Sequence, residues 1–168
     1  FDLLKPAFEI ADEGRFILGG TARHVGEVAE SEKRIADKLA AVFEWHLELN
    51  IDGYVIDAAH TGRTSGRPWG SGAVGVAAEV LYAYVSEGKK PPNLITRGHV
   101  HTIDDSGERM QETRAIMLPA SQLKPAYAQR KVVNKRSDIG SLLIVDGVLD
   151  FSKMRYKAAP GYTARYDI

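Results

Sequence analysis

Short apolar runs, each closed by glycine or by a polar turn, recur along the first part of the chain. Runs of this length bounded by turn residues are typical of buried strands. We therefore predict strands at Arg15–Leu18, at Tyr54–Asp57 and in the stretch Asn93–His101, whose apolar part ends at Gly98.

Between these runs, apolar residues recur at helical spacing. They predict one helix over Val28–Leu49 and a second over Ala73–Ser86. His46 falls inside the first helix and is interpreted as a structural residue. The order strand–helix–strand–helix–strand predicts an α/β fold with parallel or mixed pairing, because parallel strands need long crossover connections.

The rest of the chain adds simpler elements. Thr113–Leu118 predicts a fourth strand, and Ser141–Val145 and Val148–Phe151 predict a hairpin around the turn Asp146-Gly147. We expect residues 1–14 to be an approach segment with a short helix over Lys5–Asp12, and residues 157–168 to be a tail. The whole chain of 168 residues fits a single domain.

Composition removes several classes of protein. The 22 basic and 22 acidic residues cancel, which disfavours binding to nucleic acid by bulk charge and leaves only a local patch. No apolar run approaches the ~20 residues that span a bilayer, so we expect no membrane association and a cytoplasmic protein. With no cysteine, a transition-metal site must use histidine and carboxylate. Because the chain starts at Phe1, we expect a fragment, a processed chain or a piece of a longer protein.

Four of the five histidines follow a predicted strand, namely His24, His60, His99 and His101. Ligands of open α/β sheets bind outside the carboxyl ends of the strands, so these imidazoles are expected along one rim. His99 and His101 alternate in sequence and would share one face of an extended backbone. Imidazole nitrogen binds zinc, iron, copper or nickel. The alternative is four unrelated, solvated loop histidines.

Gly98-His99-Val100-His101 resembles the Gly-His-x-His motif that closes the active site of calcineurin-like metallophosphoesterases. His60, alone between a strand and a helix, resembles the isolated metal-binding histidine of that family. The loop Gly20–His24 resembles the family's Gly-Asn-His-Asp/Glu loop in altered form. The resemblance covers Arg15–Ile168 and is strongest to the small phosphoesterases of bacteriophages and prophages.

The resemblance implies a hydrolase with an αββα sandwich of mixed β-sheets flanked by helices, here lacking its first strands. It also implies two divalent metals, chosen among manganese, iron, zinc and nickel. His60 and His99 would bind one metal and His101 the other, while His24 would protonate the leaving oxygen or stabilise the transition state. A metal-bound hydroxide would then hydrolyse a phosphomonoester or phosphodiester.

The loop after His60 supplies candidates for binding the substrate. Arg63 and Arg67, with Thr61, are expected to hold phosphate oxygens, since a guanidinium matches them in bidentate fashion. A solvent-facing loop is the alternative, and Trp69 is interpreted as its anchor. The expected substrate is a phosphoester, and nucleotides and nucleic acid belong to that class. An oligomer is compatible with the sequence.

Two departures from the family pattern define the alternatives. The chain contains neither Asp-x-His nor Gly-Asp, and Thr21 or Ala22 stands where the family has its asparagine ligand. The leading hypothesis is therefore the C-terminal part of a phosphoesterase, with half of the metal ligands. The second is a catalytically inactive binding or assembly module that keeps the fold. The third is a mononuclear site of His60, His99 and His101, with an open coordination position.

Overall fold

The computed structural model describes residues 9, 11, 14–21, 28–61, 72–110, 112–120, 138, 140–145 and 148–150. Most of the predicted helix Lys5–Asp12, the turn Asp146-Gly147 and the tail lie outside these residues. Among the described residues, no helix is both long and apolar enough to cross a membrane.

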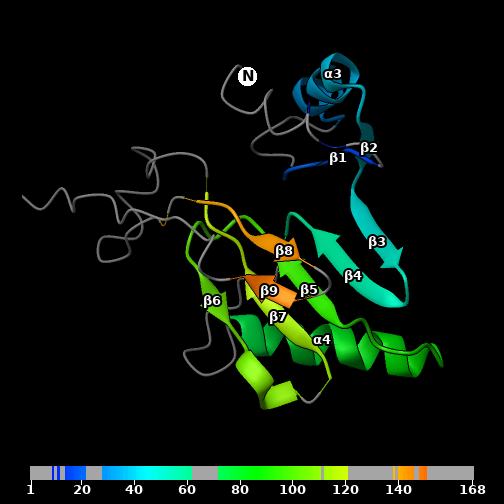
Figure 1. The fold of residues 1–168 in the computed structure, drawn as a ribbon, viewed down its shortest axis with the longest axis vertical. Helices are drawn as coiled ribbons and strands as arrows, with labels where there is room; N and C mark the ends of the chain where they lie inside the picture. The colour runs from blue at the N-terminus through cyan, green and yellow to red at the C-terminus, as the bar shows by residue number, and fades with distance from the viewer. Residues whose placement is uncertain are drawn as a thin grey trace, which may run out of the picture.

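A five-stranded mixed sheet forms the centre of the fold, with the strand order β3-β4-β5-β7-β6 (Figure 1). Strands β4, β5 and β7 run parallel, and the edge strands β3 and β6 are antiparallel to their neighbours. The strands are β3 (His46–Ile51), β4 (Tyr54–Ala59), β5 (Leu94–Arg97), β6 (Asp104–Asp105) and β7 (Arg114–Met117). The α/β class with mixed sheets flanked by helices is therefore confirmed.

Helix α4 (Ala73–Ser86) makes the crossover from β4 to β5, within the bounds that the sequence predicted. It covers one face of the sheet, as Figure 1 shows. Its small residues let it approach the strands closely, and the buried cluster consists of Ala73, Val76, Ala77, Ile95, Ala115 and Met117. The Oδ2 atom of Asp104 accepts a hydrogen bond of 2.9 Å from the Ala73 N–H, which satisfies a free donor at the start of α4.

The predicted C-terminal hairpin covers the other face of the sheet. Strands β8 (Leu143–Val145) and β9 (Val148–Asp150) pair antiparallel, as the sequence predicted. Apolar side chains of the hairpin segment pack on a second core, whose buried members are Ile56, Leu94 and Ile116. Successive residues of β5 thus point to opposite sides, Leu94 toward the hairpin and Ile95 toward α4.

The predicted helix Val28–Leu49 is wrong in its second half. Helix α3 (Glu30–Leu39) ends at Ala40, which adopts φ 49° and donates its N–H to the Ala36 and Asp37 carbonyls. The chain then forms β2 (Val42–Glu44), which pairs parallel with β1 (Phe16–Leu18), and continues into β3. α3 packs against the β1–β2 pair, at the top of Figure 1.

Candidate functional site

The parallel pair β4–β5 brings two of the predicted metal ligands together. In this register Ala59 is the partner of Arg97, and each strand ends at that pair. His60 follows Ala59, and His99 comes two residues after Arg97. The carboxyl ends of two adjacent parallel strands therefore place both histidines at the same edge of the sheet.

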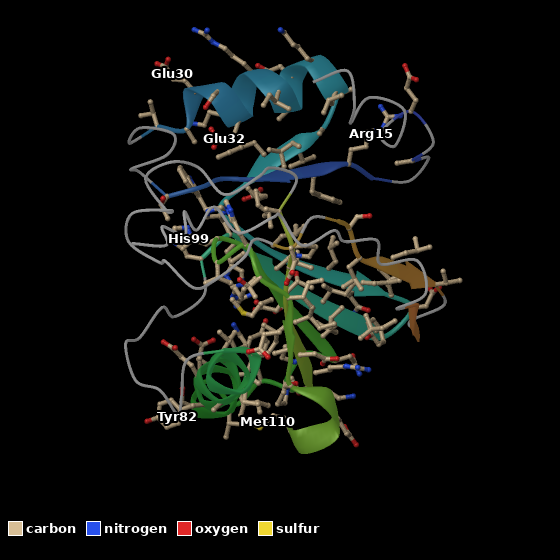
Figure 2. The ribbon with its side chains drawn as sticks, turned by 90° about the vertical axis from the view of Figure 1, so that its left-hand side faces the viewer. Arg15, Glu30, Glu32, Tyr82, His99 and Met110 are labelled. Carbon is tan, nitrogen blue, oxygen red and sulfur yellow. The ribbon has the colours of Figure 1, made fainter. Side chains whose placement is uncertain are left out.

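His60 and His99 are in direct contact. The Nδ1 atom of His99 lies 3.3 Å from the Nε2 atom of His60, and the partly buried rings meet edge to face at 5.3 Å. Figure 2 shows His99 on the side of the sheet toward α3 and β1, away from Met110. One nitrogen of each imidazole thus points at the other ring.

The backbone around Gly98 allows this approach. A Cβ atom at position 98 would lie 3.3 Å from the carbonyl oxygen of His60, closer than ordinary van der Waals contact. His99 and His101 both adopt positive φ, 70° and 56°, in the left-handed region that side chains other than glycine seldom enter. The Asp138 N–H donates to the carbonyl of His101 at 2.8 Å, which ties the end of this turn to a distant segment.

The His60–His99 separation fits a metal. Two nitrogens at ~2.0–2.1 Å from one tetrahedral ion are about 3.3 Å apart, the separation of these ring nitrogens. Across the described ranges no three histidine or acidic side chains gather at metal-ligand spacing, so His101 does not complete a cluster of three with this pair. The donor set suits zinc, iron or nickel, and it needs further ligands.

The other predicted site residues are placed only in part. Thr61 is exposed directly after His60. His24 and the loop residues Arg63, Arg67 and Trp69 lie outside the described residues.

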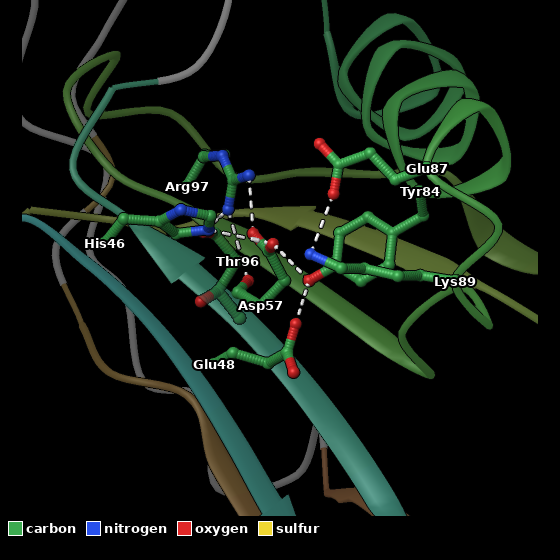
Figure 3. A network of polar contacts seen from close by, with 8 residues as sticks. All are labelled: His46, Glu48, Asp57, Tyr84, Glu87, Lys89, Thr96 and Arg97. Carbon is green, nitrogen blue, oxygen red and sulfur yellow. Dashed lines mark hydrogen bonds and ion pairs between the residues drawn. The ribbon is translucent and has the colours of Figure 1, made fainter.

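A polar network around the buried Asp57 and Arg97, on the two strands that carry the histidine pair, was not predicted (Figure 3). Asp57 of β4 is only 1% exposed, and its Oδ1 atom forms an ion pair of 2.6 Å with Nη2 of Arg97 on β5. Its Oδ2 atom contacts Nε2 of His46 at 2.8 Å and accepts a hydrogen bond of 3.0 Å from the Tyr84 hydroxyl. The interpretation of His46 as a helical residue is wrong, because it lies on β3 and reaches across to Asp57.

Tyr84 of α4 joins this network through its hydroxyl, which contacts the carboxylates of Glu48 and Asp57. Burial raises the pKa of its phenol, and the hydrogen bonds to the carboxylates of Glu48 and Asp57 raise it further. The hydroxyl therefore stays protonated, and its single proton is shared between the carboxylates of Glu48 and Asp57, at 2.5 Å and 3.0 Å from the phenol oxygen. The sequence held one signal for this cluster, since Asp57 and Arg97 stand at the ends of otherwise apolar runs and a buried charge needs a partner.

Comparison with known proteins adds one distant likeness. No protein-family model matches the chain, and no curated protein matches it. The chain is similar to the solution NMR structure of the Thermotoga maritima protein TM1076, with a TM-score of 0.44 and 14% identity. The alignment covers 94% of this chain and 87% of that one. A score and an identity of that size assign neither a family nor a function.

Proposed function

We propose that this chain forms the histidine-bearing part of the active site of a metal-dependent phosphoesterase. The observation that carries the proposal is the contact between His60 and His99, whose nitrogens lie 3.3 Å apart at the carboxyl ends of β4 and β5. The order of Gly98-His99-Val100-His101 after an isolated His60 supports it.

Each residue has a stated role in this proposal. His60 and His99 would bind one divalent metal, and His101 a second, with manganese, iron, zinc and nickel as the candidate ions. A bound metal polarises a phosphoryl oxygen and an attacking water. His24 would give a proton to the leaving oxygen, and the loop that begins at Thr61 would hold the phosphate.

The proposed substrate class comes from the resemblance to the phosphoesterase family. A phosphomonoester or phosphodiester is proposed, with a nucleotide or short nucleic acid as its source. The net charge of zero gives no bulk attraction to long duplex DNA, so recognition has to come from local groups. Arg63 and Arg67 are the residues we propose for that contact, because a guanidinium binds phosphate through two parallel hydrogen bonds.

Hydrolysis by the full chain tests the proposal. The chain is loaded with manganese or zinc and assayed on bis(p-nitrophenyl) phosphate and p-nitrophenyl phosphate. We expect metal-dependent release of p-nitrophenol that His99→Ala abolishes. Tyr82→Phe is the matched control, because Tyr82 is 78% exposed on α4 and its variant should keep full activity. Metal binding without any hydrolysis would instead favour the inactive binding module.

A further inference from the structure

The Asp57–Arg97 ion pair is almost completely buried. The Asp57 and Arg97 side chains are 1% and 8% exposed, and the charged atoms are 2.6 Å apart. Removing two charges from water carries a desolvation penalty, and apolar residues of similar volume often stabilise a core as well or better. The two buried charges therefore point to a role in fixing the relative position of β4 and β5.

Arg97 holds β4 at two points. Its Nη2 forms the ion pair with the Asp57 carboxylate, while its Nη1 donates to the main-chain carbonyl of Asp57 at 3.2 Å. Nη1 also donates to the carbonyl of Thr96 at 2.9 Å, which fixes the guanidinium against its own strand. A planar fork of donors that bridges two strands resists sliding of one strand end against the other.

His46 and Tyr84 hold the carboxylate in turn. Both contact Oδ2 of Asp57, one from β3 and one from α4, and with Arg97 on β5 the acid is contacted from three elements. Figure 3 shows these side chains converging on Asp57. The aspartate is thereby a rigid point to which Arg97 can anchor the end of β5.

The histidines lie just beyond this anchor. Beyond the last register pair, the Gly98 N–H donates to the Ala59 carbonyl at 3.4 Å, which is longer than an ordinary hydrogen bond. A bond of that length constrains the two strand ends only weakly. The Asp57–Arg97 ion pair lies directly before this bond, since Arg97 precedes Gly98 and Asp57 is two residues before Ala59. At 2.6 Å it is the stronger of the two links between the strands.

We propose that Asp57 and Arg97 are positioning residues that set the distance between His60 and His99. The inference deepens the proposed function, and its metal readout rests on that function. Its geometric readout does not, because it reports the contact between the two imidazoles themselves.

The test uses the full chain labelled with ¹⁵N and the double variant Asp57→Leu/Arg97→Met, which removes both charges and keeps apolar volume. We expect the variant to fold, and the His99 Nδ1 and His60 Nε2 shifts at fixed pH to move to those of separate imidazoles. Zinc affinity should fall by about 10–100-fold, the usual effect of losing a group that orients a metal ligand. A folded variant with unchanged imidazole shifts would overturn the proposal.

A second ion pair of the same sheet provides the control. Arg114 of β7 and Asp105 of β6 are joined at 2.6 Å, and Arg114 is the partner of Leu94 at the opposite end of the parallel strands. Asp105→Leu/Arg114→Met should leave both imidazole shifts and zinc affinity unchanged. Equal shift changes in both double variants would overturn a specific role for Asp57 and Arg97.

Arg97→Lys covers the case in which the first double variant fails to fold. Lysine keeps the positive charge beside Asp57 but lacks the fork that reaches the Asp57 carbonyl. The imidazole shifts should move in the same direction by a smaller amount, and a folded variant with wild-type shifts would overturn the proposal. If the wild type neither binds zinc nor hydrolyses phosphoesters, the proposed function fails, while the imidazole shifts still decide the positioning role.

Discussion

The Nδ1 atom of His99 lies 3.3 Å from the Nε2 atom of His60, across the ends of two adjacent parallel strands. A contact of this length between two imidazole nitrogens is an N–H···N hydrogen bond when one ring donates and the other accepts. With metal, both nitrogens face the ion as neutral acceptors. The 3.3 Å separation of the nitrogens suits either arrangement, but the rings must turn so that both lone pairs face the ion.

Gly98 should be needed for metal binding more than for stability. Gly98→Ala places a methyl group 3.3 Å from the His60 carbonyl oxygen, and the shift that relieves this contact moves one histidine against the other. Isothermal titration with zinc should show affinity lowered about tenfold, equivalent to about 1.4 kcal/mol.

Gly88→Ala is the complementary control for that experiment. Gly88 has φ 69° with open space around it, so alanine there costs about 1–2 kcal/mol of conformational strain without touching the histidines. Urea unfolding should detect this loss, while zinc affinity should match the wild type. Equal zinc affinity in Gly98→Ala and wild type would contradict the role given to Gly98.

Tyr84 should contribute to stability through its hydroxyl. Tyr84→Phe removes one O–H donor that two carboxylates share, and a hydrogen bond to a charged group is worth about 1.5–3 kcal/mol. Because the site is only partly buried, we expect a loss near the lower end, about 1.5 kcal/mol, in chemical denaturation. Tyr82→Phe, on the exposed side of the same helix, should change stability by less than about 0.5 kcal/mol. Similar losses in both variants would contradict this account.

Asp105 should make stability depend on pH in the acid range. Two hydrogen bonds from Arg114, at 2.9 Å and 2.6 Å, hold the pKa of the Asp105 carboxyl below its ordinary value of 3.8. Because the folded-state pKa is depressed, the stabilisation is complete above the unfolded pKa and is lost as the pH falls through the folded pKa.

The measurement compares the wild type with Asp105→Asn. Asparagine keeps a side-chain oxygen that can accept the hydrogen bond from the Gly107 N–H, as Asp105 does. The difference in unfolding free energy should be at most about 1 kcal/mol, since the pair is partly exposed. It should shrink as the pH falls from about 5 to about 2. A difference that grows toward low pH would show that the sign is wrong.

The sequence was sufficient for the part of the fold that positions the histidines. The apolar runs before His60 and His99, with the helix Ala73–Ser86 between them, indicated a parallel strand pair. The rule that ligands bind at the carboxyl ends of such strands then placed the two imidazoles together. His60 and His99 are in direct contact, as this rule leads one to expect for these two of the four histidines.

The region after Leu39 shows why other elements could not be predicted. Val42, Phe43 and Leu47 fit helical spacing, but Leu47 and Leu49 also alternate with the exposed His46 and Glu48, which is strand spacing. No glycine marks the end of α3, since Ala40 takes the left-handed conformation itself. The pairing of β2 with β1, which is distant in the sequence, favours strand over helix in this region.

The Asp57–Arg97 network escaped prediction for a related reason. Its members come from three strands and a helix, and they meet only once β3 pairs with β4 and α4 covers the sheet. Because the sequence pattern places His46 in a helix, it does not predict His46 as a partner of Asp57. Local patterns predict elements, whereas contacts at long sequence separation need the tertiary arrangement.

Zinc titration of the full wild-type chain beside His99→Ala tests the central claim most directly. If His60 and His99 bind one metal, the wild type should show a saturable site, and His99→Ala should lose at least about tenfold in affinity, or about 1.4 kcal/mol. Identical zinc binding by the wild type and His99→Ala, or no binding by either, would contradict the assignment of these histidines as metal ligands.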